Sequence, residues 1–594
     1  MSDRLERRRL VASALTLAVA LVASGCGVSS SNAPQDVGDP WVAETSLGSD
    51  IVLSAPDPNS ATTPEDLVQS YLKAAVGGGE ASITQVKMFL TERAKSKWIA
   101  PRDLKNPPIT VIRLVGPPVR KETKEDRTRF EVEYGVVGTL TDQGRVDELA
   151  ELTSKKTMSF WVNQPEQGSS RLRIDEIAGA PPGLLLSDET LTDLYRIQPV
   201  YFWDAANSRL VPDLRYLPLT LSTPQRALKI LQWLLAGPSL WLTGVQRLPT
   251  GTVPKAAVEL NSNGAFVVKL SAQAGAGGPD AVRRLYYQLK WSLRTGSVPS
   301  IELQIEDKTE EIPGTPDEYL QYNLTNNVGP VGQKFDIKEQ RVVALGAGVT
   351  PPALLTAKEN KDVVFAAINR EMNLAAFVRL GSDGRSRTLQ IVRQGKRGKV
   401  DAKGLKSVNM GRPVWIPGTN DQLIVTSGGH LYVVNAANGQ SFDVTPNQVN
   451  DAVSRIAVAP DGRRVAFVAS GRAYVASLKF DGDRVTVGLD PRRVLAGQLT
   501  AGAIAWASES WLYVTGTAGG KPAMWRVTAD SVVAENLSGK LNDVRPADVV
   551  AHPAGPSSRP GELIVLTTDP PGAFVFVTSL GGQEPGMVAP FFAG

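Results

Sequence analysis

One cysteine carries the clearest chemistry in this 594-residue chain. Cys26 is the only cysteine, and it follows the small residues Ala23-Ser24-Gly25 at the end of an apolar run, which is the pattern of a bacterial lipobox. A signal peptidase that cut between Gly25 and Cys26 would leave an N-terminal cysteine able to carry S-diacylglyceryl and N-palmitoyl groups. One acyl chain binds a membrane only marginally, whereas two or more anchor a protein stably. We therefore predict that Cys26 is a lipidated membrane anchor.

The residues before Cys26 have the layout of a secretory signal. Four arginines within residues 4–9 precede an apolar core at 10–22, which is too short for an ordinary membrane-spanning helix. We predict that residues 1–25 are a signal peptide and that residues 26–60, rich in Ser, Asn, Asp, Pro and Gly, form a lipid-anchored flexible tether. The arginine cluster also loosely fits a twin-arginine signal, so the choice between the Sec and Tat export routes stays open.

The rest of the chain is poor in residues that perform catalysis or bind metals. With Cys26 lipidated, no cysteine remains for a disulfide or a thiolate zinc site, and His430 and His552 are the only histidines. A Ser-His-Asp triad would have to use one of these two, and both lie in turns or at strand ends. The G-x-S-x-G elbow, the P-loop and a complete G-x-G-x-x-G are missing. We predict no catalytic residue, no cofactor and no metal.

Glycosidase chemistry is the exception, because it needs carboxylates and no histidine. Glu509, which lies between Trp506 and Trp511, is the kind of residue that such an enzyme would use. The favoured interpretation of Glu509 is an exposed loop acid beside core tryptophans.

Composition limits the partners and suggests several domains. The formal net charge is +4, and loss of the signal peptide would remove four arginines, one Asp and one Glu, which leaves the mature chain near +2. This balance gives no electrostatic case for nucleic-acid binding. The hydrophobic content of 42% is ordinary for globular proteins, and the length predicts about three domains.

The first domain is predicted at residues 61–190. Thr63 and Pro64 have the types expected at a helix N-cap and first turn, and a second helix is predicted from about Ile83 to Trp98. After Pro107-Pro108 the hydrophobic period changes to two, which predicts several antiparallel strands. Helices followed by a curled sheet resemble the NTF2-like (cystatin-like) architecture. That resemblance implies a cone with a pocket and supplies no active site.

The second domain is predicted at residues 195–310. A helix with Thr223 as its cap ends before Gly237 and is followed by the turn Pro249-Thr250-Gly251-Thr252, a hairpin, a helix near 280–295 and a strand. This order resembles the GerMN domain first recognised in spore-germination proteins, and the resemblance implies a binding or assembly module. Tyr286, Tyr287 and Trp291 are a candidate partner-facing aromatic cluster. The alternative is that Tyr286 belongs to the core and the other two are ordinary surface residues.

The third domain is predicted at residues 335–594. Five stretches of short apolar strands and polar turns recur about every 45 residues, which is the spacing of propeller blades. The clearest stretch holds the tight turn Pro460-Asp461-Gly462. We predict a β-propeller of five or six blades, in which strands near 340–345 complete the last blade and clasp the ring. No cluster of histidines or paired carboxylates recurs at the blade starts, so a binding platform is favoured.

The whole series resembles the actinobacterial lipoprotein LpqB family. It consists of a lipobox, an NTF2-like unit, a GerMN-like unit and a degenerate propeller, so the expected fold class is multidomain α+β followed by all-β. The resemblance implies a non-enzymatic lipoprotein on the extracytoplasmic face of the cell membrane. It also implies contact with the extracytoplasmic domain of an MtrB-like sensor histidine kinase, and through the MtrA–MtrB system an influence on cell-wall, division and antibiotic-stress responses.

Two alternatives stay open beside the resemblance. One is an extracytoplasmic enzyme acting on cell-wall glycan, with its site on the propeller axis or in the NTF2-like pocket. The other is a lipoprotein that binds a small ligand in that pocket. The face that binds a partner, the sign of regulation and the oligomeric state are not decided by the sequence.

Overall fold

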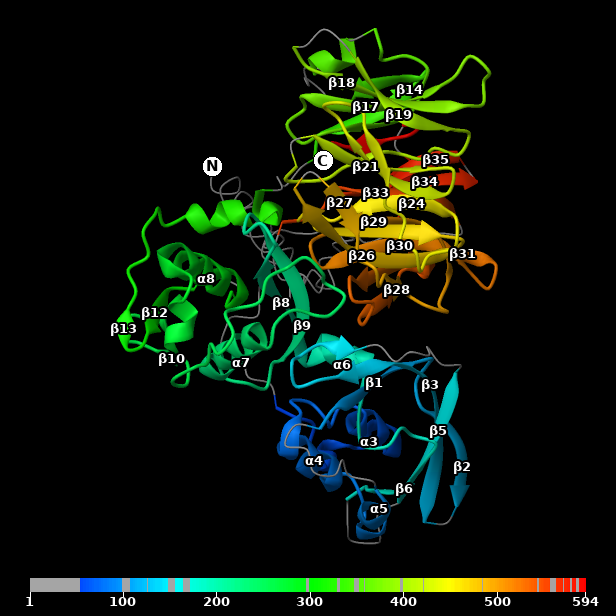
Figure 1. The fold of residues 1–594 in the computed structure, drawn as a ribbon. Helices are drawn as coiled ribbons and strands as arrows, with labels where there is room; N and C mark the ends of the chain where they lie inside the picture. The colour runs from blue at the N-terminus through cyan, green and yellow to red at the C-terminus, as the bar shows by residue number, and fades with distance from the viewer. Residues whose placement is uncertain are drawn as a thin grey trace, which may run out of the picture. The chain divides into compact units, whose positions relative to one another are not determined.

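The computed structural model describes most of the chain after the predicted tether (Figure 1). The described residues are 54–98, 107–124, 126–147, 155–163, 171–294, 299–327, 332–346, 352–356, 358–395, 399–419, 421–482, 484–541, 544–555, 562–569, 571–576, 580–583 and 587–594. All of them belong to one compact unit, Glu44–Gly594. The predicted signal peptide, Cys26 and most of the predicted tether lie outside the described residues.

The N-terminal domain begins with a well-capped helix. Helix α3 (Pro64–Tyr71) starts after Thr63, whose hydroxyl accepts a hydrogen bond from the Asp66 N–H while the Asp66 carboxylate accepts one from the Thr63 N–H. This reciprocal pair satisfies two N–H groups that a helix terminus otherwise leaves without partners. Tyr71 packs on the rings of Phe89 and Phe160, and so fixes α3 against the sheet.

The predicted second helix from Ile83 to Trp98 is wrong, because the chain forms two shorter helices, α4 (Gly79–Met88) and α5 (Glu92–Lys97). Between them the backbone pairs with a strand: the Ile174 N–H donates to the Phe89 carbonyl at 2.9 Å, and the Thr91 N–H donates to the Ile174 carbonyl at 3.0 Å. These bonds replace the helical ones, and Thr91 then caps α5 through the Ala94 N–H.

One curved sheet completes this domain. The strand order is β6-β5-β3-β1-β7, with β2 and β4 also paired to β3. The elements are β1 (Ile109–Leu114), β2 (Val119–Lys124), β3 (Arg127–Leu140), β4 (Val146–Asp147), β5 (Lys156–Asn163), β6 (Ile174–Ala178), β7 (Leu184–Ser187) and the short helix α6 (Asp188–Asp193). Side chains alternate between the core and solvent along β3, as a sheet with one covered face requires.

The middle domain starts with a long hairpin of β8 (Tyr195–Trp203) and β9 (Leu210–Pro218). Helix α7 (Thr223–Ala236) follows, and its N-cap is Ser222, one residue before the predicted Thr223. The remaining elements are β10 (Glu259–Leu260), β11 (Phe266–Leu270), α8 (Gly278–Ser292), β12 (Ile301–Ile305) and β13 (Lys308–Thr309). Strands β11 and β12 run parallel, joined by the crossover helix α8.

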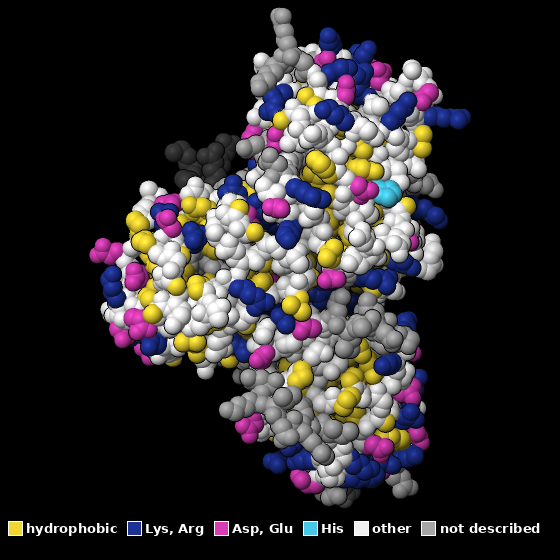
Figure 2. Space-filling view, viewed as in Figure 1, with side chains coloured by type: hydrophobic (Ala, Val, Ile, Leu, Met, Phe, Trp, Pro, Cys, Tyr) yellow, Lys and Arg dark blue, Asp and Glu magenta, His cyan; other side chains and the backbone are white. Residues whose placement is uncertain are grey.

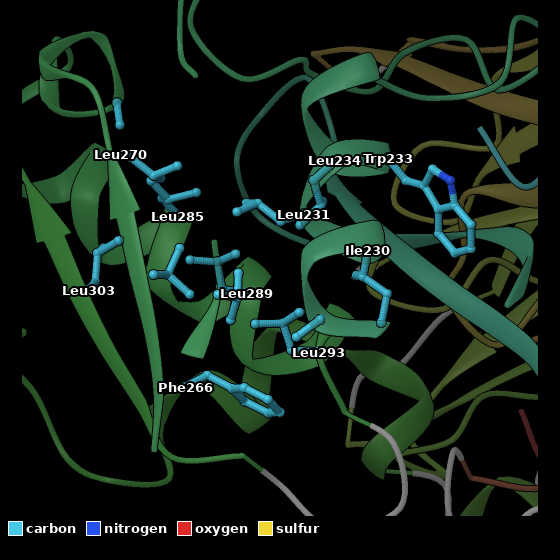
Figure 3. Close-up of a cluster of buried hydrophobic side chains, with 14 of the residues drawn as sticks. Ile230, Leu231, Trp233, Leu234, Phe266, Leu270, Leu285, Leu289, Leu293 and Leu303 are labelled. Carbon is cyan, nitrogen blue, oxygen red and sulfur yellow. The ribbon is translucent and has the colours of Figure 1, made fainter. Parts of the chain in front are cut away.

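Figure 3 shows the core of this domain. Leu231 and Leu234 of α7 face Leu285 and Leu289 of α8, and all four side chains are buried. Trp233 points away from this group, and its indole N–H donates to the carbonyl of Asp142 in the N-terminal domain at 3.0 Å. One helix therefore buries side chains in its own domain and contacts the preceding one.

The C-terminal region is a β-propeller. The described strands form six sheets, and the innermost strands β16, β20, β24, β29, β33 and β37 contact one another in that order around a ring. The strands of the first two complete sheets are β16 (Val363–Ile368), β17 (Leu374–Leu380), β18 (Arg387–Arg393), β19 (Lys399–Ser407), β20 (Val414–Trp415), β21 (Gln422–Ser427), β22 (His430–Asn435) and β23 (Ser441–Asp443). Those of the next three are β24 (Val453–Val458), β25 (Arg464–Ala469), β26 (Arg472–Asp481), β27 (Arg484–Val487), β28 (Arg492–Val494), β29 (Thr500–Trp506), β30 (Trp511–Ala518), β31 (Lys521–Thr528), β32 (Ala534–Asn536), β33 (Arg545–Ala551), β34 (Leu563–Asp569), β35 (Pro571–Phe576) and β36 (Leu580–Gln583).

The sixth sheet joins the two ends of the domain. Its strands are β14 (Lys334–Lys338), β15 (Arg341–Ala344) and β37 (Phe591–Phe592), so the predicted strand near 340–345 does take part in closing the ring. The rings of Phe335 and Phe591 stack at 5.5 Å between centroids. The buried carboxylate of Asp336 accepts hydrogen bonds from the backbone N–H groups of Val588 and Ala589. A ring closed in this way leaves no long free strand edge between its first and last blades.

Candidate functional site at the propeller face and axis

The predicted lipidation site lies outside the described residues. Because the structure does not describe Cys26 or the residues around it, the lipid anchor stays a prediction. Among the described residues, no helix is both long enough and apolar enough to cross a membrane.

The middle domain contacts the propeller at turns that follow the inner strands. The clearest contact joins Arg463, in the turn after β24, to Asp204, which follows β8. The guanidinium donates from Nε at 3.0 Å and from Nη2 at 2.8 Å to one carboxylate oxygen of Asp204, and both side chains are more than 90% buried. The Asp204 carboxylate also accepts from the N–H of Ser208. The hydrogen bonds offset the cost of burying two charges.

Glu509 lies at the same interface, in the turn between β29 and β30. The hydroxyl of Tyr201 donates to its carboxylate at 2.6 Å, and the hydroxyl of Thr325 donates at 2.8 Å. Burial raises the pKa of Glu509, while these two hydrogen bonds oppose the shift. The predicted exposed loop acid is therefore wrong: Glu509 is only 4% exposed, because the middle domain and the segment after it cover the turn.

A third polar contact belongs to the interdomain interface, a name that we use for Asp204, Tyr201, Tyr216 and Thr325 on one side and Arg463, Glu509 and Asp530 on the other. The Tyr216 hydroxyl lies 3.0 Å from a carboxylate oxygen of Asp530 and donates to it. All seven side chains are buried. Buried polar groups that find partners across two domains hold those domains in one relative position.

The predicted partner-facing aromatic cluster is not on the surface. Tyr287 and Trp291 are buried, whereas Tyr286 is partly buried, so the alternative that made only Tyr286 a core residue is wrong as well. The 3-10 helix Glu318–Tyr322 covers them, and the Trp291 indole N–H donates to the Tyr319 carbonyl at 3.0 Å. The aromatic residues Tyr319 and Tyr322, three positions apart, are the sequence signal that could have shown this packing.

The propeller axis encloses a cavity of about 320 Å³. Its walls come from the inner strands and include Trp415, Ile456, Ile504 and Trp506. Asp548 has the sole acidic side chain among the described residues that line it, and Glu509 is not one of them. The described walls thus lack the pair of carboxylates that glycoside hydrolysis requires.

The two histidines occupy different places. His430 is exposed at the start of β22 and pairs with Asp443 at 2.9 Å, away from the axis. His552 is buried at the end of β33 and lines the axial cavity. The described residues contain no group of three or more His, Cys, Asp or Glu that could hold a metal ion.

The N-terminal domain holds a second pocket, of about 400 Å³. Tyr71 and Trp98 line it together with Asp175 and Glu176. The Asp175 carboxylate already accepts from the Thr91 hydroxyl at 3.1 Å and lies 3.4 Å from Arg127. This acid is thus part of the local ion-pair network.

The viewed surface carries charges of both signs, interspersed over the middle domain and the propeller (Figure 2). Such a surface accords with the small net charge of the chain.

Family models match three consecutive regions of the chain. The model described as the lipoprotein LpqB N-terminal domain matches residues 57–192, and the model for the sporulation and spore germination domain matches residues 199–311. The lipoprotein LpqB β-propeller model matches residues 341–556. The three regions follow the order of the three domains described above.

Whole proteins show the same relationship. The chain is 24% identical over 601 aligned residues to a Lipoprotein LpqB of Cutibacterium acnes, and the match covers 94% of both chains. It is 26% identical to the Lipoprotein LpqB of Thermobifida fusca, where the match covers 55% of this chain and about half, 51%, of that relative. Among solved structures, a chain of a nidogen/laminin complex covers 44% of this chain with 9% identity and a TM-score of 0.31, which is too low to carry an argument.

Proposed function

This chain belongs to the LpqB lipoprotein family, and from that premise we propose that it is a membrane-anchored extracytoplasmic lipoprotein that binds and regulates a sensor histidine kinase of the MtrB type. Regulation would act through the MtrA–MtrB two-component system on cell-wall, division and antibiotic-stress responses. The observation that carries the proposal is the match to a family member over nearly the whole of both chains, which keeps all three domains in one order.

The predicted anchor at Cys26 supports this role. The relatives are named lipoproteins, and Cys26 is the one residue of this chain that can carry a thioether-linked lipid. A lipid anchor would hold the protein at the membrane surface, where the extracytoplasmic domain of a sensor is within reach.

The interdomain interface supports a binding role rather than a catalytic one. Glu509 is the residue that a glycosidase relying on carboxylates would use. Its carboxylate instead accepts hydrogen bonds from Tyr201 and Thr325, which join the propeller to the chain before it. The middle domain and the propeller therefore offer a partner one rigid surface. Because the two domains are already ordered, a partner that binds this surface loses no free energy of binding to ordering them.

Site-specific photo-crosslinking in native membranes tests the proposal. A photoreactive residue would replace Leu240 of the middle domain, Leu489 of the third propeller sheet or Val588 near the ring closure, which are the large apolar side chains most exposed among the described residues. We expect at least one position to capture the extracytoplasmic domain of a histidine kinase, identified by mass spectrometry. If none of the three positions captures a kinase while the protein remains anchored, the proposal is wrong.

Cys26→Ala provides the matched control. This variant should leave the body folded, because the chain has no other cysteine to form a disulfide. It should release the body from the membrane or leave an uncleaved precursor, and kinase-dependent phosphorylation of the response regulator should fall. A Cys26→Ala protein that stayed attached to the membrane after removal of the signal peptide would contradict the lipid anchor. It would not contradict the contact with the kinase, which the crosslinking experiment tests separately.

A further inference from the structure

The axial cavity of the propeller has two chemically different ends. The middle domain contacts the propeller at Arg463 and Glu509, in turns that follow inner strands β24 and β29. A second group of charges lies at the opposite ends of the inner strands. Arg412 comes just before β20, Arg455 lies in the N-terminal half of β24, and Asp548 lies in the middle of β33. This second end of the cavity belongs to the propeller alone, because every described residue that lines the cavity lies within 332–594.

Two guanidinium groups face one carboxylate at that end. Arg412 lies 3.8 Å from Asp548, and Arg455 lies 3.7 Å from it. Both distances exceed the 2.7–2.9 Å or so of a charge-assisted hydrogen bond. The side chains of Arg412 and Asp548 are only 18% and 21% exposed, whereas that of Arg455 is 41% exposed, so solvent screens the charge of Arg412 less than that of Arg455.

Two buried donors in the cavity wall have no acceptor among the described residues. They are Nε of Arg455 and the indole Nε1 of Trp415. Trp415 is 4% exposed, and both residues line the cavity. Buried donors in folded proteins nearly always have partners, so the unsatisfied Nε of Arg455, beside an excess of positive charge, indicates a site made for an acceptor that carries negative charge.

Much of the rest of the cavity wall is apolar, although Gln333, Arg370, Thr426, Ser454 and His552 also line it. Ile456, Val458, Ile504 and Val549 line it, and the volume of about 320 Å³ lies at the lower end of the range, about 300–1,000 Å³, that is usual for small-ligand sites. A site of this size accommodates a small molecule with a compact hydrocarbon or ring body.

We propose that the propeller axis binds a small amphiphilic anion, whose carboxylate or phosphate group lies between Arg412 and Arg455 and accepts from the Arg455 Nε–H, while its apolar body contacts Ile456 and Ile504. Asp548 competes with the anion for the same two guanidinium groups. The site is independent of the kinase proposal, because it lies at the end of the cavity away from the middle domain and needs no membrane anchor.

Isothermal titration calorimetry on the full mature chain in phosphatidylcholine nanodiscs tests this site. The probes are 1-naphthoate, 1-naphthyl phosphate and the neutral 1-naphthamide, with empty nanodiscs as the partition blank. We expect one or both anions to bind at least about 10-fold more tightly than the amide, which is the size of effect that one charge-assisted hydrogen bond supplies. The better of the two anions identifies the head group.

The variants separate binding from damage to the fold. Arg412→Gln and Arg455→Gln should each weaken binding of the anion about 10-fold or more. Arg484→Gln, at an exposed arginine outside the cavity, should leave it unchanged. Asp548→Asn should strengthen binding, because it removes the competing charge, and a misfolded protein would not bind more tightly.

Three results would overturn the proposal. These are wild-type protein that binds none of the probes, equal affinities for the anions and the amide, or an Asp548→Asn variant that folds with an unchanged melting temperature and binds the anions more weakly than the wild type.

Discussion

The hydroxyl of Tyr201 donates a 2.6 Å hydrogen bond to the carboxylate of Glu509, which lies 308 residues further along the chain. Both groups are buried, and they come from two domains that the sequence predicts separately. The hydrogen bond therefore joins two structural units.

Loss of this hydroxyl should loosen the contact between the domains. In Tyr201→Phe, Glu509 keeps Thr325 as a side-chain donor but loses its shortest hydrogen bond, and we expect a loss of about 1–3 kcal/mol, the usual cost of an unsatisfied buried group. Calorimetric melting of the wild type, Tyr201→Phe, Glu509→Gln and the double variant would give the coupling energy of the pair. Tyr474→Phe, on an outer strand of the propeller, is the control, and an equal loss of stability in that variant would contradict the assignment.

The stability of the interface should depend on pH through Glu509. Because its pKa is raised in the folded protein above the ordinary value of 4.5, the folded state favours the protonated form. Its contribution is fully present below the ordinary pKa and is lost as the pH rises through the raised value. Glu509→Gln, which mimics the protonated acid, should therefore gain melting temperature relative to the wild type as the pH rises from about 4 to about 8. A difference between wild type and Glu509→Gln that did not change with pH would show that Glu509 does not titrate in this way.

Removal of one member of the Arg463–Asp204 pair should be more damaging than removal of both. A single replacement such as Arg463→Met leaves a buried carboxylate without its cation, which costs about 3–5 kcal/mol, whereas replacement of a buried pair by apolar residues is often neutral. Thermal unfolding and hydrogen exchange at residues 459–466 would measure the effect. We expect Arg463→Met with Asp204→Leu to recover most of the loss, and a double variant no better than the single one would contradict the prediction.

Gly462 tests how closely two blades approach. Its φ of +67° is left-handed, and a Cβ at this position would lie 2.0 Å from the Pro417 carbonyl oxygen of the preceding blade. Gly384 has a φ of +65° with nothing within 4 Å of its Cβ position, so Gly384→Ala carries the backbone strain alone, roughly 1–2 kcal/mol. Gly462→Ala should lower the melting temperature clearly more than Gly384→Ala. Equal losses of melting temperature in the two variants would mean that the two blades can move apart enough to accommodate the added methyl group.

Local patterns in the sequence predict those parts of the fold whose causes are local. The capping of α3 by Thr63 and the tight Pro460-Asp461-Gly462 turn depend on neighbouring residues, and the structure contains both. The cap of α7 could also have been found, because Ser222 and Gln225 have the spacing of a capping box. The break between α4 and α5 could not, because its hydrogen bonds go to Ile174, more than 80 residues away.

The candidate sites depend on contacts that no local pattern records. Glu509 is covered by Tyr201 and Thr325 from outside the propeller, so its own neighbours in the sequence predict an exposed turn. Arg412, Arg455 and Asp548 come together because the ring places inner strands side by side. Histidines or paired carboxylates at the starts of the blades would not indicate this site, because its main feature is two arginines.

The pairing of Phe591 with Phe335 has a consequence for how the protein is made. A ribosome synthesises the chain from its N-terminus. Strands β14 and β15 are therefore made first, the strands of the five complete sheets follow, and the partner strand β37 is made after them. Until residues 591–592 emerge from the ribosome, the ring is open and its strand edges are unpaired. Chaperones and proteases can act on such edges, and other chains can pair with them. A product that ended before residue 591 would remain in that state. Closure of the ring therefore depends on a strand that is made after every other described strand of the propeller.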